Sequence, residues 1–563
     1  MSAIDPAIMD GYRPLLRGRR HMVVAGHYLA AQAASQILEA GGNAIDAGVA
    51  GGLVLGVVHS EYVNFAGVAP IMIYHAKTRQ VETISGLGTW PAALSPDLFE
   101  REHGEEIPEG ILRTVVPAAP CAWISALQRH GTVSFADVAA QAIHFAAEGF
   151  VMYPFMANLL AEREADYARW PSSAEIYLPG GAPPSVGDLF VQRDLAASMQ
   201  YMADEESAAA GKGRVAGLEA ARDAFYCGDI AEKILRYHGD NGGLLRAGDL
   251  SEFRSAVEAP LRSQFLDTDI YACGPWCQGP VMAQTLALLD AGDLLAAGHN
   301  SPAYIHQFTE ALKLAFEDRE RHYGDPRFVD VPLEYLLSPN YSAARRACID
   351  AGRARVEELP PSIGEPPAPR DTSYICVVDK DGNAFSATPS DVSYDTPVIP
   401  GTGFCPSSRG SQSWADPAHP SSAAPGKRPR LTPNPAMAIR DGEFVMPFGT
   451  PGGDVQCQAM LQVLLNILLF GMNPQAAVEA PRFATYSFPN SFAPHDVYPG
   501  RLNLEGRIAS QTQAELLALG HDVSMWPEWS PLAGAVCLIF QDLERATLAG
   551  AADPRRPAMA VGR

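Results

Sequence analysis

Residues 371–388 read DTSYICVVDKDGNAFSAT, and this stretch decides the fold. Residues 374–378 form an uninterrupted apolar run of strand length, an Asp-Gly pair follows at 381–382, and residues 383–388 resemble a second strand. This pattern predicts a β-hairpin with an Asp-Gly turn. Because the first strand is apolar on both faces, we expect it inside a sheet that is covered on both sides. Thr372 would then lie at the start of a central strand.

The segment before this hairpin, residues 357–370, is rich in proline. Proline forbids regular helix and favours an exposed, extended chain that tolerates a break in the backbone. The segment holds five of them, Pro360, Pro361, Pro366, Pro367 and Pro369. We therefore predict a cleavage site between Asp371 and Thr372, which divides the chain into a large part, residues 1–371, and a small part, residues 372–563.

Thr372 would gain a chemical role from such a cut. A threonine at a new N-terminus carries a hydroxyl nucleophile and a potential base, its own α-amine, on one residue. The reference pKa of an α-amine is about 7.7 to 8.0, so much of it can accept the hydroxyl proton near neutral pH. Before the cut, the same hydroxyl could attack the carbonyl of Asp371 and release the new terminus through an ester. The plain alternative is a threonine that only begins a strand.

Several motifs accompany the hairpin in order along the chain. They are GGNAIDA at 41–47, EALKLAFEDR at 310–319, GDP at 324–326, GTPGG at 449–453 and EAPRF at 479–483. With residues 371–384 they make the chain similar, from about His21 to about Val536, to the γ-glutamyltransferase family of N-terminal nucleophile hydrolases. The resemblance implies an α+β fold, a four-layer αββα sandwich in which both parts form one intertwined domain, and a precursor that cleaves itself.

The resemblance also implies roles for single residues. Thr372 falls on the family's nucleophile, and Ser390 keeps a hydroxyl that could hydrogen-bond the hydroxyl or amine of Thr372. Gly452 and Gly453 fall on the glycine-rich loop that holds the oxyanion, where paired glycines let two backbone N–H groups approach without side chains in the way. A simple tight turn is the alternative for these glycines. Asn43 is expected to cap a helix.

The glutamyl pocket departs from the family pattern. Leu87 stands where the family has an arginine for the α-carboxylate, and Gln412 replaces the acidic residue for the α-amino group. Arg409 replaces a glutamine, and Leu431 and Thr432 replace paired serines. A zwitterionic glutamyl group needs both a cation and an anion, because burying either of its charges unpaired costs several kcal/mol.

The substrate we expect is therefore a small amide with an anionic acyl part and no α-ammonium. Arg409 could hold its carboxylate with a bidentate fork, with Gln412 and Thr432 beside it; a structural arginine is the alternative. We favour hydrolysis over transfer. Three other functions stay open: a γ-glutamyl transferase or glutathione hydrolase, an acylase for larger amides, and a binding relative without catalysis.

Composition and net charge restrict the classes of partner, compartment and cofactor that we expect. The 563 residues are 47% hydrophobic, enough for a large core, and the net charge of −22 argues against nucleic acid and anionic membrane as partners. Residues 1–20 hold no apolar signal region, and nine scattered cysteines fit a reducing compartment, so we expect a cytoplasmic protein. Cys273 and Cys277 have no histidine nearby in sequence, so we expect no metal and no cofactor. The two parts should associate, and a higher oligomer stays open.

Overall fold

The computed structural model describes residues 11–104, 106–356, 362, 364–366 and 372–563. The predicted proline-rich linker and Asp371 lie largely or wholly outside these residues. Two antiparallel sheets of seven strands each form the centre of the molecule. The first runs β19 (Met559–Gly562), β2 (Met22–Ala25), β10 (Ile375–Val378), β11 (Ala384–Ala387), β3 (Ile71–His75), β4 (Gln80–Ile84) and β7 (Val257–Glu258). The second runs β1 (Leu16–Gly18), β18 (Thr547–Ala552), β17 (Cys537–Asp542), β13 (Phe444–Gly449), β12 (Ala436–Arg440), β9 (Thr268–Ala272) and β8 (Leu261–Phe265).

The predicted hairpin is β10 and β11, in the interior of the first sheet. Ile375 pairs with Ala387 and Val378 with Ala384, and Gly382 of the turn has a φ of 83°, which glycine adopts without strain. β10 lies between β2 and β11, so its backbone is paired on both edges. The prediction of a central strand is confirmed.

Both faces of this hairpin are buried, against different layers. Ile375, Val377 and Phe385 belong to the core under the helices of the first layer. Tyr374 and Cys376 point the other way, into a core between the two sheets that also contains residues of β12, β13 and β17. This two-sided burial explains the unbroken apolar run in the sequence.

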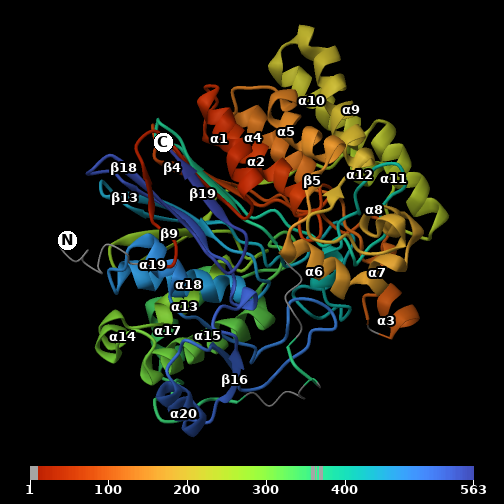
Figure 1. Cartoon of the computed structure of the whole chain (residues 1–563). Coiled ribbons are helices and arrows are strands. Elements are labelled where there is room, and N and C mark those ends of the chain that lie inside the picture. The colour runs from red at the N-terminus through yellow and green to blue at the C-terminus, as the bar shows by residue number, and fades with distance from the viewer. Residues whose placement is uncertain (1–10, 105, 357–361, 363, 367–371) are drawn as a thin grey trace.

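Helices cover the outer face of each sheet. Figure 1 shows α1 (Tyr28–Glu39), α2 (Ala44–Val58), α4 (Ala119–His130) and α5 (Phe135–Glu148) on one side of the paired sheets. On the other side lie α13 (Gly279–Leu288), α15 (Pro302–His322) and α18 (Val455–Leu468). The molecule is thus a four-layer αββα sandwich, as the resemblance implied.

The α2 helix packs closely on the hairpin because it is rich in small residues. Asn43 caps it, accepting from the backbone N–H groups of Ile45 and Asp46, as expected. A Cβ at Gly48 would meet the ring of Phe385 at 2.2 Å, so only glycine allows this approach. The helix begins directly after Asn43, as the sequence predicts.

The remaining elements surround this sandwich. The helices are α3 (Leu98–His103), α6 (Pro154–Glu162), α7 (Glu164–Ala168), α8 (Pro171–Tyr177), α9 (Arg193–Ala209), α10 (Arg214–Tyr226), α11 (Asp229–Asp240), α12 (Ala247–Ser251), α14 (Ala291–Ala297), α16 (Leu333–Leu336), α17 (Pro339–Arg346), α19 (Pro474–Glu479) and α20 (Ser510–Ala518). The strands are β5 (Phe150–Val151), β6 (Leu189–Phe190), β14 (Phe483–Thr485), β15 (Arg501–Glu505) and β16 (Asp522–Trp526). Among the described residues, we find no helix with the length and apolar content needed to cross a membrane.

Candidate active site

Thr372 lies three residues before β10, at the end of the first sheet. It forms an antiparallel bridge with Ser390, which follows β11, so the hairpin itself brings the two residues together. The Oγ1 atom of Thr372 is 2.8 Å from the Oγ atom of Ser390. Both side chains are buried, with 1% and 0% of their surface exposed. The hydroxyl contact expected from the sequence is therefore present.

The N-terminal end of α18 approaches Thr372 from the second layer of helices. Gln456, the second residue of α18, donates from Nε2 to the Oγ1 atom of Thr372 over 3.4 Å. The first turn of a helix presents N–H groups without intrahelical partners and carries partial positive charge. Negative charge that develops on a reacting group near Thr372 would be stabilised by this helix end. Sequence reasoning missed Gln456, although its place directly after the glycine-rich loop was a usable signal.

The glycine-rich loop leads directly into this turn. Gly452 has a φ of 131° and Gly453 a φ of 55°, values that residues with side chains adopt only with strain. Their carbonyls accept from the N–H groups of Val455 and Gln456 at 2.9 Å and 3.1 Å. The two glycines thus lie three and four residues before the side chain that contacts Thr372. Backbone N–H groups in such a turn are suited to bind an oxyanion.

Two of the sequence motifs hold this loop in place. Arg319, in the long helix α15, is fully buried and pairs with Asp454 at 2.6 Å, immediately before α18. Arg482 donates to the carbonyl of Ala533 at 2.9 Å, and the N–H of nearby Ala535 donates to Thr450 at 2.8 Å. The motifs at 310–319 and 479–483 therefore position the glycine-rich loop indirectly, the first through Asp454 and the second through residues 533–535.

The predicted substrate residues continue a line of polar side chains that begins with Thr372 and Ser390. Arg409, in the short turn Arg409–Gln412, donates from Nη2 to the Oγ atom of Ser390. Its Nη1 atom lies 3.4 Å from Oε1 of Gln412, whose Nε2 donates to Thr432 over 2.9 Å. Their side chains are 0–1% exposed. Residues from three separate loops thus meet next to Thr372, and we call this set, from Thr372 through Ser390, Arg409 and Gln412 to Thr432, the polar line.

Asp391 holds the guanidinium of Arg409 in this position. Its carboxylate lies 3.7 Å from Nε of Arg409 and accepts at 2.5 Å from the hydroxyls of Ser407 and Ser408. Burial raises the pKa of Asp391, while the Arg409 charge and the serine hydrogen bonds act in the opposite direction. Asp391 has a φ of 129°, a strained value for a residue with a side chain. Sequence reasoning missed this residue, which no local pattern distinguishes.

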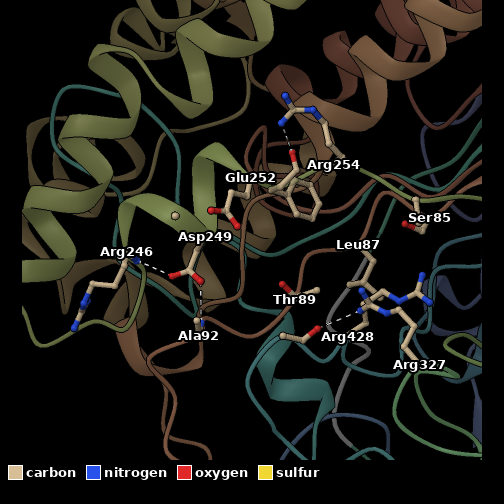
Figure 2. A pocket seen from close by; sticks show the side chains of 14 residues that line it. Ser85, Leu87, Thr89, Ala92, Arg246, Asp249, Glu252, Arg254, Arg327 and Arg428 are labelled. Carbon is tan, nitrogen blue, oxygen red and sulfur yellow. Dashed lines mark hydrogen bonds between the residues drawn. The ribbon is translucent and has the colours of Figure 1, made fainter.

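Leu87 stands at the position of the family's arginine, but it lines a pocket that contains no residue of the polar line. It packs with Trp276 and Leu431 in a small apolar cluster, and Leu431 directly precedes Thr432 of the polar line. The pocket has a volume of about 510 Å³ and is shown in Figure 2. Its charged lining residues are Arg246, Asp249, Glu252, Arg254, Arg327 and Arg428. Most of these arginines are neutralised by carboxylates, because Arg254 pairs with Glu219, Arg327 with Asp325, and Arg428 with both Asp325 and Glu258.

Cys273 and Cys277 belong to the same apolar cluster as Leu87. The Sγ atom of Cys277 donates to the carbonyl of Pro433 at 3.1 Å, and both thiols are buried. Burial, with Cys277 beside it, raises the pKa of Cys273, which favours the thiol over the metal-binding thiolate. The two cysteines therefore act as apolar packing residues next to the loop that contains Thr432.

Known proteins share this architecture. The Gamma-glutamyltranspeptidase family model matches residues 30–562. The Glutathione hydrolase-like YwrD proenzyme of Bacillus subtilis (strain 168) is 32% identical, over 97% of this chain and 99% of the relative. The Oxamate amidohydrolase proenzyme of Klebsiella pneumoniae subsp. pneumoniae is 30% identical, over 96% of this chain and 98% of the relative. The solved structure of cephalosporin acylase from Bacillus halodurans matches with a TM-score of 0.85 and 26% identity, over 98% of this chain and 97% of that one.

These matches agree with the hairpin, the two sheets and their helix layers. The family model covers the chain from α1 to the last strand, β19, so the likeness is not confined to one motif. The relative with 32% identity matches over nearly its full length. The chain belongs to the gamma-glutamyltranspeptidase family of N-terminal nucleophile hydrolases.

Proposed function

We propose that this chain is a self-processing amidohydrolase that cuts its own backbone before Thr372. N-terminal Thr372 would then hydrolyse a small amide whose acyl part carries negative charge and no α-ammonium. The observation that carries the proposal is the position of the Thr372 hydroxyl. It lies 2.8 Å from Ser390 and within 3.4 Å of Gln456, at the N-terminal end of α18.

Both reactions would use the same hydroxyl. In the precursor, Oγ1 of Thr372 attacks the carbonyl carbon of Asp371, and the peptide nitrogen leaves as the new α-amine. Water then hydrolyses the ester, giving the Asp371 carboxylate and the Thr372 hydroxyl. In turnover, the α-amine accepts the hydroxyl proton while Oγ1 attacks the substrate amide.

The backbone N–H groups of Gly452 and Gly453 would bind the oxyanion that forms in this attack. The helix end behind them favours the same charge. The substrate amine then departs with a proton, and water releases the acyl group from the ester. Ser390 would orient the hydroxyl or the amine of Thr372, because its own Oγ atom accepts from Arg409.

The charges around the site support an anionic acyl part. Arg409 places a guanidinium next to Ser390, while the family's acidic residue is the neutral Gln412. The carboxylate of Asp391 already accepts from two serines and lies beside Arg409, so it serves to hold that cation. Oxamate, named for one relative, is an amide of this class.

An acylase for larger acyl groups is the second candidate. Leu87 places an apolar side chain where the family has an arginine, and cephalosporin acylase shares the fold over nearly the whole chain. A γ-glutamyl substrate is disfavoured, since its ammonium would meet Arg409 and Gln412.

Intact mass of the purified protein tests the cleavage. Wild type should give two fragments, residues 1–371 and 372–563, and Thr372→Ala should give one uncut chain without activity. Ser373→Ala is the matched control, since it removes the neighbouring buried hydroxyl and should still cut before Thr372. An uncut wild type, or a cut Thr372→Ala variant, would refute the proposed nucleophile.

A panel of p-nitroanilides tests the substrate class. The succinyl and glutaryl compounds carry an anionic acyl part, butyryl is neutral, γ-glutamyl adds the ammonium, and phenylacetyl is large. We expect the highest kcat/KM for succinyl or glutaryl. A preference for phenylacetyl would support the acylase, and a preference for γ-glutamyl would contradict our reading of Gln412.

A further inference from the structure

A second group of potential metal ligands lies where the first sheet meets helix α4, far from Thr372 in sequence. It consists of His75 at the end of β3, Glu82 in β4 and His130, the last residue of α4. One potential metal-ligating atom from each residue lies within 4.8 Å of those of the other two. The proposed amide chemistry uses none of the three.

The strand register explains how the first two residues meet. β3 and β4 are adjacent antiparallel strands in which Ile73 pairs with Glu82 and His75 with Gln80. His75 and Glu82 are therefore diagonal neighbours on one face of the hairpin, within reach of each other.

The third residue comes from the helix layer that covers this face. His130 ends α4, and its ring centroid lies 4.1 Å from that of His75. Its Nε2 atom contacts Oε1 of Glu82. Asn43 ties the helix end to the start of α2 by donating to the carbonyl of His130 at 2.7 Å. All three side chains thus stand on well-anchored elements.

An unsatisfied nitrogen points to a missing ligand. The Nε2 atom of His75 is buried and has no hydrogen-bond partner among the described residues. Most buried polar atoms in proteins are hydrogen-bonded, and an unpaired one costs about 1 to 3 kcal/mol. A bound metal ion would satisfy this lone pair.

The remaining surroundings suit a metal site. Two imidazole nitrogens and one carboxylate form a three-ligand set that zinc accepts, with water in a fourth position. The side chains of Glu82 and His130 are 19% and 20% exposed, so water can reach the group. Arg129 donates to both carboxylate oxygens of Glu82, from Nε to Oε1 at 3.3 Å and from Nη2 to Oε2 at 2.8 Å, and so orients the carboxylate, as outer partners of metal ligands do.

We propose that His75, Glu82 and His130 bind a divalent transition-metal ion of the zinc type, with water completing the coordination. The ion would join β3, β4 and α4, and would stabilise the folded chain by mass action. This inference revises the expectation from sequence that the chain binds no metal. It does not depend on the proposed amidohydrolase activity.

A second cluster of three potential ligands differs from this site in its burial. His306, Glu310 and His521 also gather three potential ligands, but they are fully buried. His306 already contacts His521 at 2.9 Å, and Lys313 lies 2.5 Å from the Glu310 carboxylate. Its three residues are 1–3% exposed, against 19–20% for the side chains of Glu82 and His130, so water and a metal ion do not reach them and this cluster is a structural network.

Cobalt(II) titration of tag-free, chelator-treated protein tests the proposal. Wild type should bind one equivalent with visible d–d absorption, lack the sulfur charge-transfer band that exposed Cys227 or Cys348 would give, and lose the signal when zinc is added. His75→Ala should weaken binding by at least about 100-fold, beyond the roughly 10- to 100-fold cost of losing an outer partner. His144→Ala, which removes an exposed histidine from α5, is the matched control and should bind as wild type does.

Glu82→Gln provides a second test, because it keeps the shape of the side chain and removes the anionic ligand. Circular dichroism of each variant establishes that it is folded before binding is compared. Equal cobalt affinity of wild type and a folded His75→Ala or Glu82→Gln variant would overturn the proposal. Absence of the d–d bands in wild type, or a sulfur band in their place, would also overturn it.

Discussion

The two ends of the polar line are built in different ways. At the nucleophile end, Thr372 and Ser390 are placed by one hairpin, and Gln456 by the first turn of a helix. At the substrate end, Arg409 and Thr432 come from separate loops and meet only through side-chain contacts. Backbone pairing joins Thr372 to Ser390 at the first end, while at the second end the loops have backbone hydrogen bonds of their own but meet each other through side chains.

This difference suggests how one fold can serve several substrates. The groups proposed for the reaction are a hydroxyl, its amine and backbone N–H groups, which tolerate little change. The groups proposed for recognition are side chains that can be exchanged without altering the sheets. Leu87 and Gln412 illustrate such exchanges, since both lie where the family resemblance predicts charged residues. Substitutions at the two ends should therefore have separable effects.

Among substitutions that keep Thr372, the largest effect is expected for Gly452→Ala at the nucleophile end. An alanine at a φ of 131° is strained and would move the N–H groups that we assign to the oxyanion. We expect kcat to fall by about 100- to 1,000-fold for every amide tested, the usual cost of losing an oxyanion donor. Steady-state kinetics of the cleaved protein measure this fall.

Gly442→Ala is the control for this variant, because Gly442 also has a positive φ, of 75°, but lies in an exposed turn with open space around it. It should leave kcat within about twofold of wild type, since substitutions at exposed positions change little. A similar loss of kcat in both variants would assign the effect to general strain.

An intermediate effect is expected for Gln412→Glu at the substrate end. The new carboxylate would stand beside Arg409, repel an anionic acyl group and accept an ammonium. The kcat/KM ratio of γ-glutamyl to glutaryl p-nitroanilide should rise about tenfold or more, since charged hydrogen bonds contribute about 1.5 to 3 kcal/mol. Gln32→Glu adds the same charge at an exposed position of α1, away from the site, and should leave the ratio unchanged.

The smallest effect is expected for Arg327→Gln in the pocket of Figure 2. Its side chain is 52% exposed and pairs with Asp325 at 2.5 Å, so its charge is screened by water and offset by that carboxylate. KM for anionic amides should rise by about two- to fivefold, with kcat unchanged, in line with the weak energies of exposed charges. Arg321→Gln, 60% exposed and outside this pocket, should leave KM unaltered. An equal change for the neutral butyryl compound would argue against a role for charge.

The hairpin could be predicted from sequence because its signals are local. Residues 374–378 are apolar on both faces since both faces are buried, and the Asp-Gly turn fixes the register. Thr372 and Ser390 followed from the resemblance, and the structure places their hydroxyls 2.8 Å apart. Their catalytic roles stay predictions until the cleavage is measured.

Other parts of the site have no local signal. Asp391 matters because the chain turns through a strained φ and brings its carboxylate to Arg409, which neighbouring residues do not reveal. Gln456 reaches Thr372 only when helix and hairpin from different layers are packed together. The metal-site residues are likewise up to 55 positions apart, from His75 to His130, and meet only through sheet register and helix packing.

The strand order in the first sheet has a consequence for assembly. β10 and β11 belong to the small part, yet they lie between β2 and β3 of the large part, and β19 of the small part pairs with β2 on its other edge. Neither part can complete this sheet alone. The peptide bond before Thr372 would thus act as a tether that keeps the two parts at high effective concentration while the chain folds. Once the strands are interleaved, the tether is dispensable, and separating the parts would require unfolding the sheet.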